Sequence, residues 1–329
     1  MSAQDAQPLL SVRRLVIEFS TRYGPVRAVD GVSFDVYPNE TVGIVGESGC
    51  GKTVTGLSLL RLIPSPPGRI VSGEILLQGR DLTKLSEDEM QLLRGDEISM
   101  IFQEPMTALN PVLTVGTQMV DVLTRHRKLT RRQAKGVATE MLSKVGIPVP
   151  KKRIDEYPHE MSGGMRQRVM IAMALSCEPK LLIADEPTTA LDVTTQAQVL
   201  EQIVKLQDEF HMSVILITHD LGVVAETCQR ALVMYCGEVI ERADIQSLFE
   251  RPQHPYSRGL LDSIPKLREE KLAELPIIPG MVPDLLHLPP GCRFADRCSR
   301  VSDECRLGRP QIDVNVMSGN DVACFHPLD

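Results

Sequence analysis

Short apolar runs alternate with helical patterns between about residues 10 and 240, and four of these runs have the character of buried strands. Each is rich in Ile, Val or Leu, as a strand covered on both faces should be. The four runs are Thr41–Val45, Ile98–Phe102, Leu181–Ala184 and Val214–Thr218. Their alternation with helical segments predicts an α/β fold with a mainly parallel sheet.

A polar group follows each of these runs at once. The groups are a glycine-rich loop that begins at Gly46, then Gln103, the pair Asp185 and Glu186, and His219. Ligands of open α/β sheets bind where strands present their C-terminal ends. Four such groups at four strand ends therefore indicate one ligand site rather than chance.

The middle of the chain has a different pattern, which is mostly helical from about residue 106 to residue 176. Candidate helices are Val115–Arg125, Arg131–Val145 and Met165–Leu175. This segment is expected to form a helical insertion in the sheet domain.

Proline becomes dense beyond about residue 250. One short helix is expected there, near Tyr256–Ile264, followed by loops around a group of cysteines. The change in composition predicts a main domain at residues 1–250 and a small extension at residues 251–329.

Composition excludes several classes of protein. The net charge of −7 argues against a nucleic-acid binder, and aromatic residues at 4% with no Trp argue against base-stacking surfaces. The N-terminus lacks the basic start and apolar core of a signal peptide, and no apolar run approaches the ~20 residues that cross a bilayer. We therefore expect a cytosolic protein that reaches a membrane only through a partner.

The glycine-rich loop matches the phosphate-loop pattern in full, after a strand and before a helix. Its residues are Gly46, Glu47, Ser48, Gly49, Cys50, Gly51, Lys52 and Thr53. The glycines let backbone N–H groups converge on phosphate oxygens at a helix N-terminus. Lys52 is expected to pair with the β- and γ-phosphates, and the Thr53 hydroxyl with Mg²⁺. The loop thus predicts ATP and Mg²⁺ as ligands.

Two further motifs carry chemistry. Asp185 would organise Mg²⁺ through its water shell, and Glu186 would polarise the attacking water as a general base. The sequence Ser162-Gly163-Gly164 begins a helix, with Ser162 as a good N-cap and open amides that suit an anion.

In their order along the chain, these motifs together with Gln103, Leu191-Asp192 and His219 resemble the nucleotide-binding subunit of an ABC transporter over roughly residues 10–240. The resemblance implies a P-loop ABC nucleotide-binding domain: a RecA-like core, an antiparallel β subdomain and the helical insertion. It also implies a head-to-tail dimer with two ATP molecules. Each would lie between the phosphate loop of one domain and the Ser-Gly-Gly loop of the other.

The resemblance assigns roles to single residues. Gln103 would sense Mg²⁺ and the γ-phosphate and relay that state to the membrane subunit. Asp192 would support the facing site, and His219 would contact the γ-phosphate and hold the water in line with Glu186.

An aromatic residue would stack on adenine, with Tyr23 as the candidate and Phe19 as its rival. Met161 and Met165 depart from the family signature, which often has Leu and Gln at these places. The Ser and both glycines are present, so the function of the motif is expected to be intact.

Further segments narrow the family. His254-Pro255-Tyr256 and the stretch 275–280 resemble the C-terminal extension of oligopeptide and dipeptide importers, and the segments 101–111 and 184–192 resemble that subfamily as well. The resemblance implies a "D"-type subunit, paired with a second, homologous ABC ATPase. It also implies two integral membrane permease subunits and an extracytoplasmic solute-binding protein, with this chain on the cytoplasmic face of the bacterial inner membrane. Peptides are the default substrate; nickel complexes, glutathione and antimicrobial peptides are alternatives.

Eight cysteines fall into two groups. Four are scattered and are expected to be small buried hydrophobes, namely Cys50, Cys177, Cys228 and Cys236. Four cluster near the C-terminus, at Cys292, Cys298, Cys305 and Cys324.

The gaps in the second group are wider than those of the tight pairs typical of zinc. The resemblance implies a [4Fe–4S] cluster there, with Zn²⁺ as the alternative and plain buried thiols as a third reading. Five nearby arginines are expected to offset the charge of such a site: Arg293, Arg297, Arg300, Arg306 and Arg309.

Two rival functions differ in class from the importer subunit. A soluble ABC-type ATPase of translation or DNA repair usually carries two cassettes or a long coiled coil, and this chain has one cassette and neither extra. An iron–sulfur redox or sensor module would need the cysteines, but not ATP hydrolysis, as its main chemistry.

Overall fold

The computed structural model describes residues 7–189, 192–264, 277–312 and 320–328. The chain divides into two compact units. The first unit comprises Met1–Val36, Thr41–Thr83 and Ile217–Asp329, and the second comprises Tyr37–Glu40 and Lys84–Leu216. Within the described ranges, no helix has both the length and the apolar character that crossing a membrane requires.

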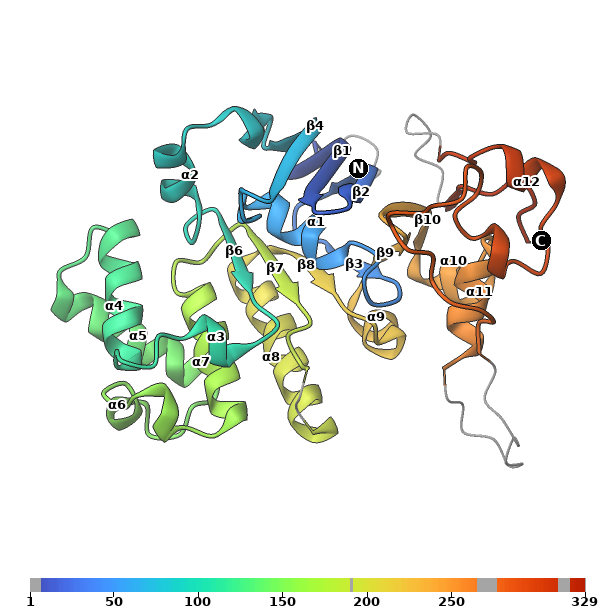
Figure 1. The fold of residues 1–329 in the computed structure, drawn as a ribbon. Coiled ribbons are helices and arrows are strands. Elements are labelled where there is room, and N and C mark those ends of the chain that lie inside the picture. Colours follow the sequence, from blue (N-terminus) through green and yellow to red (C-terminus); the bar gives the residue numbers. More distant parts are fainter. Residues whose placement is uncertain (1–6, 190–191, 265–276, 313–319, 329) are drawn as a thin grey trace, which may run out of the picture. The chain divides into compact units, whose positions relative to one another are not determined.

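The first unit contains a four-stranded antiparallel sheet in the order β2-β1-β4-β5. Its strands lie side by side in blue and cyan in Figure 1: β1 Leu10–Thr21, β2 Gly24–Val36, β4 Gly68–Leu77 and β5 Arg80–Asp81. A bulge at Arg14, with φ of 47°, shifts the register between Val12 and Leu15. This sheet confirms the antiparallel β subdomain expected from the resemblance.

The first unit also contains strands in the order β11-β10-β9-β3. These are β3 Thr41–Val45, β9 Arg230–Tyr235, β10 Glu238–Asp244 and β11 Asn320–Val322. Strand β3 runs parallel to β9 and is buried at every position, which explains its uninterrupted apolar pattern. The helices of this unit are α1 Lys52–Leu59, α9 Leu221–Thr227, α10 Ile245–Glu250, α11 Pro255–Asp262 and α12 Asp303–Leu307.

The second unit has strands in the order β8-β7-β6, and β6 and β7 are parallel. Their bounds are β6 Ile98–Ile101, β7 Leu181–Asp185 and β8 Ser213–Ile217. Its helices are α2 Glu87–Leu93, α3 Pro105–Ala108, α4 Val115–His126, α5 Arg131–Lys144, α6 Pro150–Arg153, α7 Gly163–Leu175 and α8 Val193–Phe210. Helices α4, α5 and α7 pack on one another and form the expected helical insertion (Figure 1).

The predicted elements are present, with small shifts at their ends. Helix α7 begins at Gly163, two residues before the predicted start, because the Ser162 side chain accepts a hydrogen bond from the Met165 N–H. Helix α11 begins at Pro255 because the His254 ring nitrogen Nδ1 accepts from the Tyr256 N–H. Capping side chains of this kind decide where a helix starts.

Candidate functional site

The loop between β3 and α1 has the backbone of a phosphate cradle. Gly46, Gly49 and Gly51 have φ values of 150°, 80° and 103°, which side chains rarely tolerate. A Cβ at Gly46 would lie 2.2 Å from the Met234 carbonyl oxygen, and one at Gly51 would lie 2.4 Å from that of Ala28. The loop can therefore take this path only with glycine at positions 46 and 51.

Lys52 places its charge inside this loop. Its side chain is buried, and Nζ donates to the carbonyl oxygens of Gly46 at 2.7 Å and Glu47 at 3.0 Å. Burial raises the pKa of the neighbouring Cys50 thiol, so Cys50 is held as a neutral, weakly reactive group. Because the Cys50 thiol is neutral, the positive charge available to an anion in this loop is the Lys52 ammonium group.

Two other predicted site residues of the first unit, His219 and Tyr23, lie at its surface. His219 is exposed and lies two residues after the end of β8. Tyr23 lies at the turn between β1 and β2, is 70% exposed, and has the Arg22 guanidinium 4.6 Å from its ring centroid. Phe19 is half-buried within β1, so exposure favours Tyr23 as the stacking residue.

In the second unit, the structure brings Gln103 and Glu186 together. Gln103 Nε2 donates to Glu186 Oε2 at 2.9 Å, and Thr189 Oγ1 donates to the same oxygen at 2.9 Å. Glu186 has a left-handed backbone with φ of 45°, a conformation that is costly for a side chain and concentrated at functional sites. Asp185, directly before it, is buried at the end of β7.

The Ser-Gly-Gly loop and Asp192 also lie in the second unit. A Cβ at Gly163 would meet open space, whereas one at Gly164 would lie 3.3 Å from Thr195 Cγ2. Asp192 caps α8, since its carboxylate accepts from Thr195 N at 3.0 Å and Thr195 Oγ1 at 2.7 Å, and these bonds lower its pKa. Leu191 of the same motif lies outside the described residues.

The four C-terminal cysteines line one small cavity in the first unit, together with His254, His326 and Arg300. Burial raises the pKa of Cys292 to about 11 and also raises those of Cys298 and Cys324. Among the described residues, no group of three or more His, Cys, Asp or Glu side chains is arranged to hold a metal ion.

The expectation that five arginines offset a charge at these cysteines is largely wrong. Four of them form ion pairs with carboxylates: Arg293 and Arg309 with Asp30 and Glu238, Arg297 with Glu47, and Arg306 with Asp296. Arg300 lines the cavity, and its backbone N–H donates to Cys298 Sγ at 3.4 Å. The other cysteines are buried, as predicted: Cys50, Cys177, Cys228 and Cys236.

One feature was missed by sequence reasoning. The side chain of Glu47, in the phosphate loop, forms a two-point ion pair with Arg297, and the backbone N–H of Glu47 donates to the hydroxyl of Tyr256. The acidic residue within the phosphate loop was the available signal, but its partners are more than 200 residues away.

Known proteins share these features. Residues 29–189 match the ABC transporter family, and residues 240–305 match the C-terminal region of oligopeptide and dipeptide transporters. A probable peptide ABC transporter ATP-binding protein of Sinorhizobium fredii is 52% identical, over 97% of this chain and 95% of its own length. The dipeptide transport ATP-binding protein DppD of Bacillus subtilis is 54% identical, over 89% of this chain and 87% of its own length.

Solved structures agree with this result. The cassette MJ0796, solved as a dimer bound to ADP and Pi, is 26% identical with a TM-score of 0.65 and covers 72% of this chain and 98% of its own. The cbiO1 protein of Clostridium perfringens, part of an ABC transporter complex, is 27% identical with a TM-score of 0.62, over 74% of this chain and 90% of its own.

The fold and these motifs are those of an ABC-type ATPase, and the chain hydrolyses ATP with Mg²⁺ as its cofactor. It belongs to the family of ATP-binding subunits of ABC peptide importers, whose ATP hydrolysis energises peptide uptake. Membership implies a dimeric arrangement of ATPases and membrane permease partners.

Proposed function

We propose that this chain binds ATP at Gly46–Thr53, hydrolyses it with Glu186, and thereby drives the import of di- and oligopeptides across the bacterial inner membrane. The observation that carries the proposal is the phosphate loop, whose glycines close over α1 and whose Lys52 ammonium lies inside it. The full-length similarity to peptide-transporter subunits supports the substrate class.

The roles within the site follow from charge and position. Lys52 neutralises phosphate charge, and backbone N–H groups of the loop and of the start of α1 donate hydrogen bonds to phosphate oxygens. Thr53 and Gln103 would hold Mg²⁺, with Asp185 orienting its water shell; the ion supplies charge neutralisation on the phosphates. Glu186 accepts the proton of the attacking water.

Other residues are proposed to hold the attacking water, the adenine and the site of the facing subunit. His219 holds the water in line, and Tyr23 stacks on the adenine. The loop Ser162-Gly163-Gly164 and Asp192 serve the site of a facing subunit, which is a second, homologous ABC ATPase. We place the catalytic domain at residues 1–250, with its helical subdomain at about 106–176, and the importer extension at residues 251–329.

The assembly would place this chain on the cytoplasmic face of the membrane, attached to two permease subunits that receive substrate from an extracytoplasmic solute-binding protein. If the importer instead carried a nickel complex, glutathione or an antimicrobial peptide, the ATPase chemistry of this chain would be the same. The chain itself carries a match to the oligopeptide and dipeptide transporter C-terminal region, which favours peptides.

Uptake measurements test the substrate class. Deletion of the gene is expected to abolish uptake of labelled di- or oligopeptides, and the tagged chain is expected to co-purify with integral membrane proteins. A chain that instead co-purifies with ribosomes or DNA would contradict the importer function. Normal peptide uptake in the deletion strain, with loss of nickel or glutathione uptake, would reassign the substrate alone.

We also propose that Cys292, Cys298, Cys305 and Cys324 hold a [4Fe–4S] cluster of structural role. The donor set fits, because all four thiols line one cavity. The gaps between these cysteines are wider than those of the tight pairs typical of zinc, which favours a cluster over a single zinc ion. When bound, the cluster supplies four iron–thiolate bonds that hold this loop-rich region together.

Absorbance and metal analysis of anaerobically purified protein test the cluster. We expect a broad visible absorption band with about four irons and four sulfides per chain, both lost in Cys298→Ser. The matched control is Cys177→Ser, which alters a buried cysteine of the second unit and should keep the band. One zinc per chain, or no metal at all, would refute the cluster.

A further inference from the structure

The C-terminal lobe, defined as the described residues from 251 to 328, contacts the phosphate loop directly. Its contact point is Glu47, the second residue of the loop. Two side chains of the lobe, Arg297 and Tyr256, hold the carboxylate and the backbone N–H of this residue. All of these residues belong to the first unit.

Arg297 is held from several sides. Its Nη1 and Nη2 donate to the two Glu47 carboxylate oxygens at 2.7 and 3.0 Å, and its Nε donates to the Pro279 carbonyl at 3.0 Å. The guanidinium lies 5.8 Å from the Tyr235 ring centroid and 5.9 Å from that of Phe294. Its side chain is 4% exposed, and the bond to Glu47 raises its pKa. A charged group fixed in this way has one available geometry.

Tyr256 provides the second contact. Its ring is fully buried, with centroids 4.7 Å from Tyr235 and 5.4 Å from Phe294, and its hydroxyl accepts from the Glu47 N–H at 2.9 Å. The peptide before Glu47 is therefore oriented by an aromatic cluster of β9 and the lobe.

Glu47 passes this constraint to the phosphate-binding groups. Its carbonyl oxygen accepts from Lys52 Nζ at 3.0 Å and from the Cys50 N–H at 3.3 Å. One residue thus connects Arg297 to the lysine of the loop. A two-point ion pair between arginine and carboxylate is among the strong, directional hydrogen-bonded contacts in proteins. A loop that is already ordered loses less entropy when its ligand binds.

We infer that Arg297 and Tyr256 are positioning residues that the C-terminal lobe supplies to the phosphate loop, and that ATP affinity depends on them. This inference rests on the proposed ATP site at Gly46–Thr53. It gives the C-terminal lobe a role in nucleotide binding, in addition to any role in recognising a partner or a substrate.

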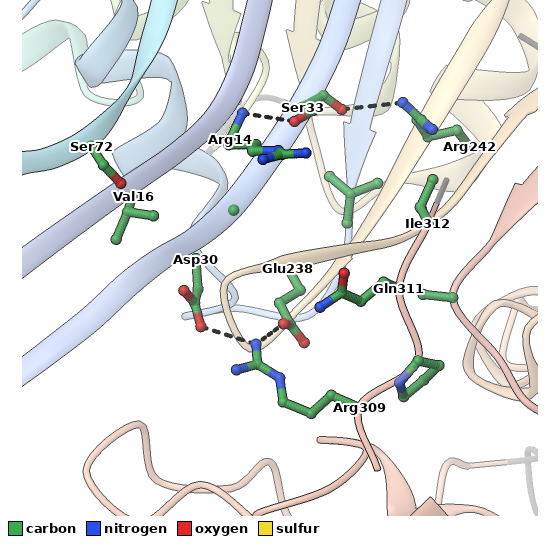
Figure 2. Close-up of a pocket in the computed structure, with 14 residues that line it drawn as sticks. Arg14, Val16, Asp30, Ser33, Ser72, Glu238, Arg242, Arg309, Gln311 and Ile312 are labelled. Carbon is green, nitrogen blue, oxygen red and sulfur yellow. Dashed lines mark hydrogen bonds and ion pairs between the residues drawn. The ribbon is translucent and has the colours of Figure 1, made fainter. Parts of the chain in front are cut away.

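A second set of ion pairs holds the lobe without touching the phosphate loop. Arg309 lines a cavity of about 530 Å³. It forms ion pairs with Asp30 and Glu238, between which it lies in Figure 2. It therefore offers a matched control: the same residue type in the same lobe, paired with carboxylates of β2 and β10 rather than with Glu47.

The test is a double-mutant cycle on the full chain, with the affinity for a non-hydrolysable ATP analogue as the readout. Arg297→Met is expected to weaken binding about tenfold, and Glu47→Gln several-fold. The double variant should bind about as weakly as Arg297→Met, because both changes remove one interaction. Tyr256→Phe, which removes only the hydroxyl, should weaken binding as well.

Arg309→Met should lower the melting temperature while leaving the affinity within about twofold. Equal affinity of Arg297→Met, Glu47→Gln and the wild type would overturn the inference, as would strictly additive losses. Should Arg297→Met fail to fold, Glu47→Gln still decides, because its side chain is 29% exposed. Lys52→Met separates this inference from the proposed ATP site. Normal binding of the analogue by this variant refutes the ATP site itself. Lost binding supports the site, and the affinity of Arg297→Met then decides whether the lobe positions the phosphate loop.

Discussion

Substitution of Glu186 by glutamine is expected to lower ATP turnover by about 10²-fold or more, the scale of losing a general base, while ATP binding persists. The amide can still accept from Gln103 and Thr189 through its oxygen, so the local geometry should survive. What it loses is the capacity to take a proton from water. Steady-state phosphate release and analogue binding, measured on the same preparation, separate the two effects.

Glu209→Gln is the control for this experiment. Glu209 is a surface acid of the second unit that forms an ion pair with Lys144 at 2.6 Å, and it is not one of the predicted catalytic groups. It should leave turnover unchanged. Near-normal turnover of Glu186→Gln would refute the assignment of the base.

Replacement of Gly51 by alanine is expected to destabilise the protein by about 3 kcal/mol or more and to abolish ATP binding. A left-handed backbone costs a side chain about 1–3 kcal/mol. In addition, the new Cβ would lie 2.4 Å from the Ala28 carbonyl oxygen, so the loop or β2 has to move. Chemical denaturation gives the free energy of unfolding, and titration with an ATP analogue gives the affinity.

Gly49→Ala isolates the backbone part of this effect, and the difference between the two variants is the steric part. Gly49 also has a positive φ, of 80°, but an added Cβ there meets no atom within 4 Å. Only the backbone cost of about 1 kcal/mol should appear. If the two variants unfold at the same denaturant concentration, the close approach of Ala28 does not limit the loop.

The elements that the sequence predicts correctly are those with a local cause. Strand β3 was predicted to its exact ends because all five of its residues are buried, and α4 and α5 were predicted to within one residue. The ends of α7 and α11 shifted because side chains of Ser162 and His254 cap them. The bulge at Arg14 in β1 was not predicted, since register is decided by the neighbouring strand.

The arginines near the cysteines show a prediction from sequence proximity that failed. Their sequence proximity suggested a shared role, yet Arg293, Arg297 and Arg309 turn to carboxylates of distant segments. A buried guanidinium needs an acidic partner, and which acid lies within reach depends on how the chain packs.

The sequence by itself determined the chemistry of this protein: a phosphate loop between a buried strand and a helix, a carboxylate pair at a strand end, and four clustered cysteines. These features depend on neighbouring residues, so spacing and composition are sufficient to find them. The tertiary structure alone decided that Arg297 holds Glu47 across 250 residues of chain, and that Gln103 donates to Glu186. Long side chains select partners by distance in space, and that distance exists only once the core has packed.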